Sequence, residues 1–86
     1  MRHFASSKFW RCFNSLPAEV QSQARRQFNL LKQSPEHPSL KLKSISGARF
    51  RSVRVGLGYR ALGVPVPEGV QWFWIGTHAE YDRLIG

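Results

Sequence analysis

Residues 52–75 read SVRVGLGYRALGVPVPEGVQWFWI, and this stretch decides the fold. Apolar and polar residues alternate in its first part, and 70–75 form a dense apolar run, as is typical of strands in half-buried and buried sheets. A Gly-Leu-Gly segment predicts one tight turn, and a Pro-Glu-Gly segment predicts another. Because short connections join antiparallel strands, the stretch predicts a three-stranded meander with 70–75 as the central strand.

Elements on either side of this stretch complete the sheet and its cover. The alternation of leucine and lysine over 40–43 predicts a further strand. Two helices are predicted upstream, over about Ser7–Ser15 and from Pro17 to about Gln33, each with apolar residues at helical spacing. Downstream, Thr77 is a predicted cap for a short helix over His78–Leu84.

This order of elements predicts an α+β fold in a single domain spanning 1–86. Two N-terminal helices are expected to pack on one face of a roughly four-stranded antiparallel sheet, followed by a short C-terminal helix. The other face of the sheet is then open. Trp72 and Trp74 share one parity and Phe73 has the other, so we expect one of these rings on the open side and the aromatic run chiefly in the core.

From His37 to Pro67 the chain has no Asp or Glu, yet this stretch holds six of its thirteen Lys and Arg residues. The formal net charge of the chain is +8. Alternation directs Val53 and Val55 toward the helices and Arg54 onto the open face. Cations on one sheet cannot neutralise one another, so nucleic acid is the predicted partner, with a strongly acidic protein as the alternative. The other members of the predicted basic surface are Lys41, Lys43, Arg49, Arg51 and Arg60.

His78 directly follows the apolar run, within the sequence GTHAEY. Histidine exchanges protons near neutral pH, and a helix would bring Tyr81 onto the same face as His78. The pair therefore suits acid–base chemistry. The alternative is that His78 caps the helix start and that Tyr81 is a packing anchor.

Several classes of site and location are disfavoured by composition. Cys12 is the only cysteine, so a disulfide framework is excluded and a reducing cytoplasm is expected. No signal peptide or membrane-length apolar segment is apparent, and no metal site or cofactor is expected, because His78 and Glu80 would diverge on a helix. RNA cleavage without a metal needs a proton taken from the 2′-OH, a proton given to the leaving oxygen, and cations at the phosphate.

Three segments together resemble the RelE/ParE superfamily of type II toxins, most closely its YafQ-like and HigB-like branches. They are LKLKSISG at 40–47, SVRVG with GYR between 52 and 60, and WIGTHAEYD at 74–82. The resemblance runs from the second helix to the end of the chain. It implies two helices on an antiparallel sheet, although the first strand usual in the family is not identifiable before Phe9. It also implies a bacterial toxin neutralised by a cognate antitoxin.

In the RelE-like branches the implied activity is metal-independent cleavage of mRNA in the ribosomal A site. The resemblance makes Arg60 a phosphate contact and His78 the acid or base. Arg54 and, more loosely, Arg51 match basic strand positions, and Tyr81 matches a terminal aromatic. The extra His and acidic residues of some branches are missing between His37 and Pro67. The implied partners are the antitoxin, the ribosome and mRNA, with operator DNA bound through the antitoxin.

Two other functions remain open. The ParE branch keeps the fold, lacks the ribonuclease residues and inhibits DNA gyrase. A non-catalytic RNA-binding protein would use the same cations without chemistry. The His78 ending favours the ribonuclease branch over the gyrase inhibitor.

Overall fold

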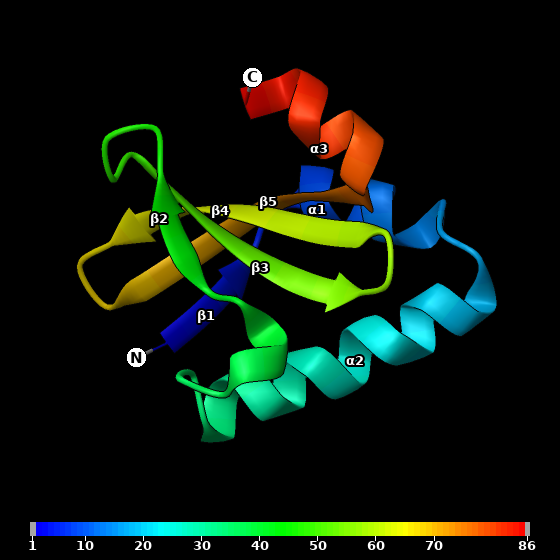
Figure 1. Ribbon diagram of the computed structural model, residues 1–86, viewed down its shortest axis with the longest axis horizontal. Helices are drawn as coiled ribbons and strands as arrows, with labels where there is room; N and C mark the ends of the chain where they lie inside the picture. The colour runs from blue at the N-terminus through cyan, green and yellow to red at the C-terminus, as the bar shows by residue number, and fades with distance from the viewer. Residues whose placement is uncertain (1, 86) are drawn as a thin grey trace.

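The computed structural model describes residues 2–85 and has an α+β architecture, as predicted (Figure 1). Helices α1 and α2 cover one side of a sheet, and α3 lies on the other side. Within the described chain no helix is both long and apolar enough to cross a bilayer. The elements are β1 (Arg2–Ala5), α1 (Ser7–Asn14), α2 (Ala18–Gln33), the 3-10 turn η1 (Pro38–Leu40), β2 (Lys43–Ile45), β3 (Phe50–Gly56), β4 (Tyr59–Val66), β5 (Gly69–Thr77) and α3 (His78–Ile85).

The sheet has five strands in the order β1-β5-β4-β3-β2, not the four that we expected. The meander β3–β4–β5 is antiparallel as predicted, but β4 and not β5 is its middle strand. The additional strand, β1, pairs in parallel with β5 and makes the sheet mixed. Its four residues have no apolar run, so the pairing depends on β5, a contact distant in sequence that no local pattern reveals.

The strand predicted over 40–43 is also wrong. Pro38 starts a 3-10 turn that ends at Leu40, and Lys41 follows with a left-handed backbone, φ 45°. Leu40 is fully buried beneath the sheet core, and β2 begins only at Lys43. The alternation of leucine and lysine therefore reflects one buried turn residue and not a pleated strand.

The main core lies between the sheet and the helices α1 and α2. Val53 and Val55 face this side, as predicted, and Trp72 is the largest fully buried side chain. Gly63 lies opposite Trp72 in the β4–β5 pair, and a Cβ at Gly63 would approach the Trp72 ring to 2.9 Å. The sheet thus makes room for the indole by omitting a side chain. The helices contribute Phe9, Phe13, Ala24 and Leu31 to this core.

A β-bulge separates Trp72 from Trp74 and corrects the parity that we predicted for the aromatic run. Leu62 pairs with Trp74 and Gly63 pairs with Trp72, so Phe73 has no partner across the ladder. The bulge sends Trp74 to the opposite face from Trp72. There it forms a second, smaller core with Leu62 and Tyr81 beneath α3. The face that we predicted to be open is therefore partly covered.

His3 ties β1 to the main core through Trp72. The indole Nε1–H of Trp72 donates a hydrogen bond to His3 Nδ1 at 3.1 Å. Burial, and then the positive charge of Lys32, lower the pKa of His3 below its ordinary value. The hydrogen bond requires an unprotonated Nδ1, and the lowered pKa favours the neutral imidazole in the folded protein.

Acidification is expected to destabilise the protein through His3. Its folded-state pKa lies below the unfolded value of about 6.5. Between the two values the unfolded chain binds more protons, so this contribution to stability is full above about pH 6.5 and is lost as the pH falls. Urea unfolding at pH 7.5 and pH 5 checks this. His3→Leu should reduce the difference, and His37→Ala, an exposed loop control, should retain it; an equal difference in all three would contradict the assignment.

Candidate active site

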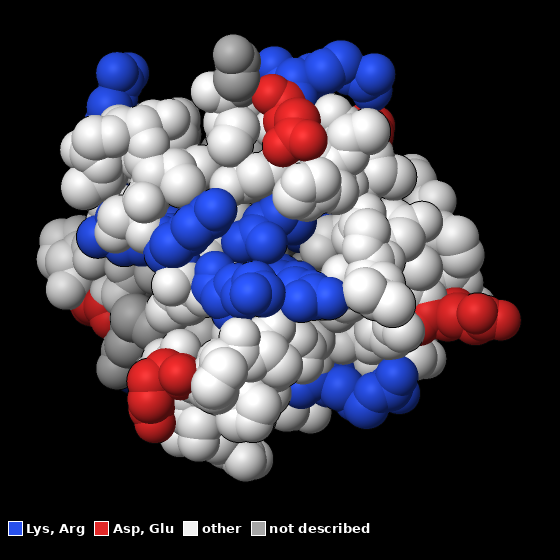
Figure 2. Space-filling model, viewed as in Figure 1, with Lys and Arg blue, Asp and Glu red and all other residues white. Residues whose placement is uncertain are grey.

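A hollow of about 240 Å³ opens on the α3 side of the sheet, where β3, β4 and α3 meet. Four residues that we predicted from the sequence line it together: Lys41, Arg54, Arg60 and His78. Figure 2 shows Lys and Arg side chains gathered at the centre of this view, with Asp and Glu toward its edges. The hollow therefore combines positive charge with one imidazole.

The ends of β4 and β5 bring His78 to the hollow. Thr77, the last residue of β5, pairs with Tyr59, the first residue of β4. The next backbone N–H, that of His78, donates to the carbonyl of Gly58 at 2.7 Å. Gly58 has φ 82° in the tight turn between β3 and β4, a conformation that favours glycine. The turn and the helix start thus hold each other in place.

Thr77 and Glu80 form a capping box at the start of α3. The Glu80 carboxylate accepts from the Thr77 backbone N–H at 3.0 Å and from its hydroxyl at 2.9 Å, and Thr77 Oγ1 accepts from the Glu80 N–H at 3.1 Å. The backbone bond, followed by the hydroxyl bond, lowers the pKa of Glu80. Thr77 is the cap that we predicted, and Glu80 serves the helix start.

The His78 side chain is 55% exposed, and its Nε2 lies 3.5 Å from Asp82 Oδ2, one helical turn away. The carboxylate places a negative charge beside the ring. Asp82 was missed in the sequence analysis, although its i,i+4 spacing from His78 is the signal that identifies it. The imidazole is thus accessible and has a charged partner.

Arg60 forms the floor of the hollow and is only 5% exposed. Its Nε donates to Ser52 Oγ at 2.9 Å, and its Nη2 donates to the Lys41 carbonyl at 3.3 Å. The guanidinium lies over the Tyr81 ring, 5.1 Å from the centroid. Burial lowers the pKa of Arg60, although an arginine stays protonated. Arg60 is on the predicted face, but it is not the exposed side chain that we expected.

The other predicted cations divide into two groups. Arg54 is only half-buried and lies directly opposite Arg60, and Lys43 lies opposite Ser52 on the same face. Arg51 has the opposite parity, and its Nη1 donates to the carbonyl of Ala48 at 3.1 Å. Arg49 lies in the turn between β2 and β3. The structure does not bring Arg49 or Arg51 to the hollow.

Tyr81 is 2% exposed and packs against Leu62 and Trp74. Its ring centroid is 5.7 Å from that of His78, but its buried hydroxyl has no hydrogen-bond partner among residues 2–85. This placement favours the alternative in which Tyr81 is a packing anchor. Tyr81 supports His78 on one side and Arg60 on the other.

No group of three His, Cys, Asp or Glu side chains in the described part of the chain is placed to hold a metal ion. The chemistry that the hollow itself offers is proton exchange at His78 and electrostatic attraction from Lys41, Arg54 and Arg60. Both suit a phosphodiester.

Comparison with known proteins identifies a family. The sequence matches the family model of the ParE-like toxin domain over residues 18–83. No curated protein sequence matches the chain.

Solved structures share the fold at low sequence identity. A chain of the RelB–RelE antitoxin–toxin complex from Methanococcus jannaschii superposes with a TM-score of 0.73 and 13% identity, covering 96% of this chain and 99% of that one. YafQ from E. coli strain BL21(DE3) superposes with a TM-score of 0.72 and 13% identity, covering 93% of this chain and 96% of that one. A YoeB/ParE toxin from Agrobacterium tumefaciens superposes with a TM-score of 0.68 and 15% identity, covering 91% of this chain and 99% of that one. At these identities the likeness establishes the fold.

Proposed function

The chain belongs to the ParE-like toxin domain family, and from this premise we propose that it is the toxin of a bacterial type II toxin–antitoxin pair and cleaves ribosome-bound mRNA without a metal ion. The observation that carries the proposal is the shared hollow: an accessible His78 lies beside Arg54 and Lys41. These side chains come from segments distant in sequence. If the cations of the strand face were only solvated, there would be no reason for an imidazole to lie beside them.

The proposed mechanism assigns each group a separate task. Arg54 and Lys41 bind the scissile phosphate, and buried Arg60 adds positive potential from below. His78 transfers one proton, either from the 2′-OH or to the leaving 5′-oxygen, and the Asp82 carboxylate lies beside its ring. We assign the other transfer to water, because within residues 2–85 only one histidine lines the hollow.

Primer extension on cellular mRNA after brief induction tests the proposal. We expect discrete new 5′ ends inside reading frames within minutes, and their loss when translation is blocked before induction. Intact mRNA in arrested cells would overturn the assignment of ribonuclease activity.

A second candidate is inhibition of DNA gyrase without hydrolysis. The burial of Arg60 and Tyr81 favours it, because two of the four side chains that we predicted to be catalytic are withdrawn from solvent. Induction would then stop replication and trigger a DNA-damage response while mRNA stays intact. A purely RNA-binding protein would instead bind with strong salt dependence and leave growth almost unaffected.

A further inference from the structure

Phe50 and Phe73 lie side by side on the α3 side of the sheet, which is also the side of the His78 hollow. Their ring centroids are 5.9 Å apart, and the ring planes are inclined by 54°. Phe73 packs against the small core beneath α3, yet both phenylalanine side chains are only half-buried. Part of this aromatic pair therefore faces solvent.

The β-bulge in β5 explains why Phe73 is on this side. Phe73 has no partner across the β4–β5 ladder, where the pairing passes from Trp72 directly to Trp74. Phe73 and Trp74 consequently both contact the small core, although neighbouring residues of a regular strand point to opposite faces. Trp74 is buried in that core, whereas Phe73 stays at its edge. Bulges commonly re-aim a side chain beside a functional site, and this one presents a ring to solvent.

Cations flank the two rings. Lys8 of α1 places its Nζ over the Phe73 ring, 5.9 Å from the centroid. Toward the other edge of the sheet, Lys43 projects from β2, the strand next to Phe50. None of the elements α1, β2, β3, β4 and β5 contains an Asp or Glu. Aromatic rings among cations, without acids between them, are typical of surfaces that bind single-stranded nucleic acid.

The rings adjoin the hollow along β3. Phe50, Ser52 and Arg54 share one face of this strand, and Ser52 Oγ accepts a hydrogen bond from Arg60 at the floor of the hollow. Phe50 and Arg54 are four residues apart, about 13 Å at the rise of a strand. Sites for single-stranded nucleic acid typically extend over about 4 nucleotides or more. One strand can therefore place a phosphate at Arg54 and a base at the rings.

We propose that Phe50 and Phe73 form a stacking site for an unpaired nucleobase of the RNA whose phosphate lies in the hollow. The base stacks on the exposed part of the Phe73 ring, and Lys8 contacts a flanking phosphate. Because every base has a π-face, the site adds affinity and positions the strand without reading its sequence. The inference rests on the proposed function only in that RNA reaches the hollow, and it does not require that the RNA be cut.

The test uses the full chain and two strands of about eight nucleotides with equal length and charge. One is a 2′-O-methyl oligoribonucleotide, which lacks the 2′-OH and cannot be cleaved through it. The other has the same sugar–phosphate backbone without any bases. Fluorescence anisotropy of end-labelled strands measures both affinities. We expect the strand with bases to bind about fivefold to a hundredfold more tightly.

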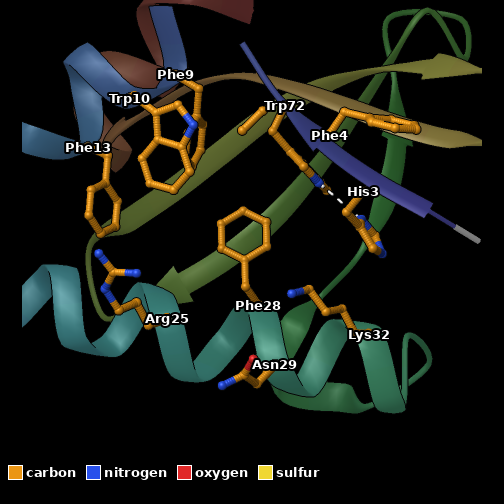
Figure 3. A pocket seen from close by; sticks show the side chains of 11 residues that line it. His3, Phe4, Phe9, Trp10, Phe13, Arg25, Phe28, Asn29, Lys32 and Trp72 are labelled. Atoms are coloured by element: carbon orange, nitrogen blue, oxygen red, sulfur yellow. Dashed lines mark hydrogen bonds between the residues drawn. The ribbon is translucent and has the colours of Figure 1, made fainter. Parts of the chain in front are cut away.

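Variants locate the stacking site. Phe73→Leu and Phe50→Leu keep an apolar side chain but remove the ring, so each should lower the preference for the strand with bases about fivefold or more. Phe73→Tyr retains a ring and should keep the preference. Trp10→Leu is the matched control, because Trp10 is 44% exposed but lies at a hollow on the other side of the sheet, between α1, α2 and β1 (Figure 3). It should bind both strands as the wild type does, and thermal unfolding checks that each variant is folded.

Three outcomes would overturn the stacking site. These are equal binding of the two strands by the wild type, an unchanged preference in both leucine variants of the phenylalanines, and no saturable binding of either strand. If the two strands bind equally but Arg54→Ala weakens both, the phosphate contact in the hollow stands and only the stacking site fails. None of these measurements involves cleavage, so primer extension on cellular mRNA decides the ribonuclease assignment separately.

Discussion

Replacing His78 by alanine is expected to abolish the growth arrest that the protein causes on induction. Loss of a single acid or base typically lowers a rate by about 100-fold to 10,000-fold. The His78 side chain is 55% exposed, so its removal should leave the fold intact. Colony counts after induction, together with primer extension on the same cells, measure the effect. Antitoxin binding should be unchanged.

Two further variants make this result specific. His37→Ala removes an imidazole that accepts a hydrogen bond from the Ser39 N–H in an exposed turn, away from the hollow, and should remain fully toxic. Asp82→Asn keeps the His78 ring but removes the carboxylate beside it, so it should cut messages more slowly than the wild type. Full toxicity of His78→Ala would show that the imidazole has no catalytic role and would favour the gyrase mechanism.

The sequence predicted those parts of the fold that local patterns determine. Alternation and turn residues were sufficient for the meander over 52–75, and Thr77 identified the start of α3. The strand β1 was not predictable, because its short sequence has no apolar run and becomes a strand only beside β5. Leu40 was wrongly predicted to lie in a strand, because a buried leucine in a 3-10 turn has the same spacing as one in a strand.

Four of the residues that line the basic hollow could be predicted, but Arg49 and Arg51 do not reach it, and its depth was not predictable. Strand parity placed Arg54 and Arg60 on one face, and the position of His78 after a buried strand brought it to the same surface. Burial of Arg60 depends on α3, which packs there because the bulge at Phe73 turns Trp74 toward it. A bulge that reverses the facing of side chains in mid-strand cannot be recognised within a continuous apolar run. The partial cover of this face by α3 is therefore seen only in the structure.

Arg60→Ala is expected to cost the protein a large part of its stability, about 2–4 kcal/mol in the free energy of unfolding. The change leaves the Ser52 hydroxyl and the Lys41 carbonyl without the donors that they have now. It also removes the guanidinium that lies over the ring of Tyr81, a buried residue of α3. Urea unfolding monitored by tryptophan fluorescence measures the loss, because Trp74 lies in the same small core as Tyr81.

Arg54→Ala is the matched control, because Arg54 lies directly opposite Arg60 on the same face but is only half-buried. Like charges at opposed positions repel, so this variant should keep or slightly raise stability. The variant should instead lose RNA affinity. The slope of log K against the logarithm of the salt concentration should fall in magnitude by about one. If Arg60→Ala unfolds at the wild-type urea concentration and loses only RNA affinity, then Arg60 is an exposed phosphate contact in solution. If Arg60→Ala loses stability and Arg54→Ala loses RNA affinity, then Arg60 has the structural role and Arg54 contacts the phosphate. The net charge of the strand face alone does not distinguish these two roles.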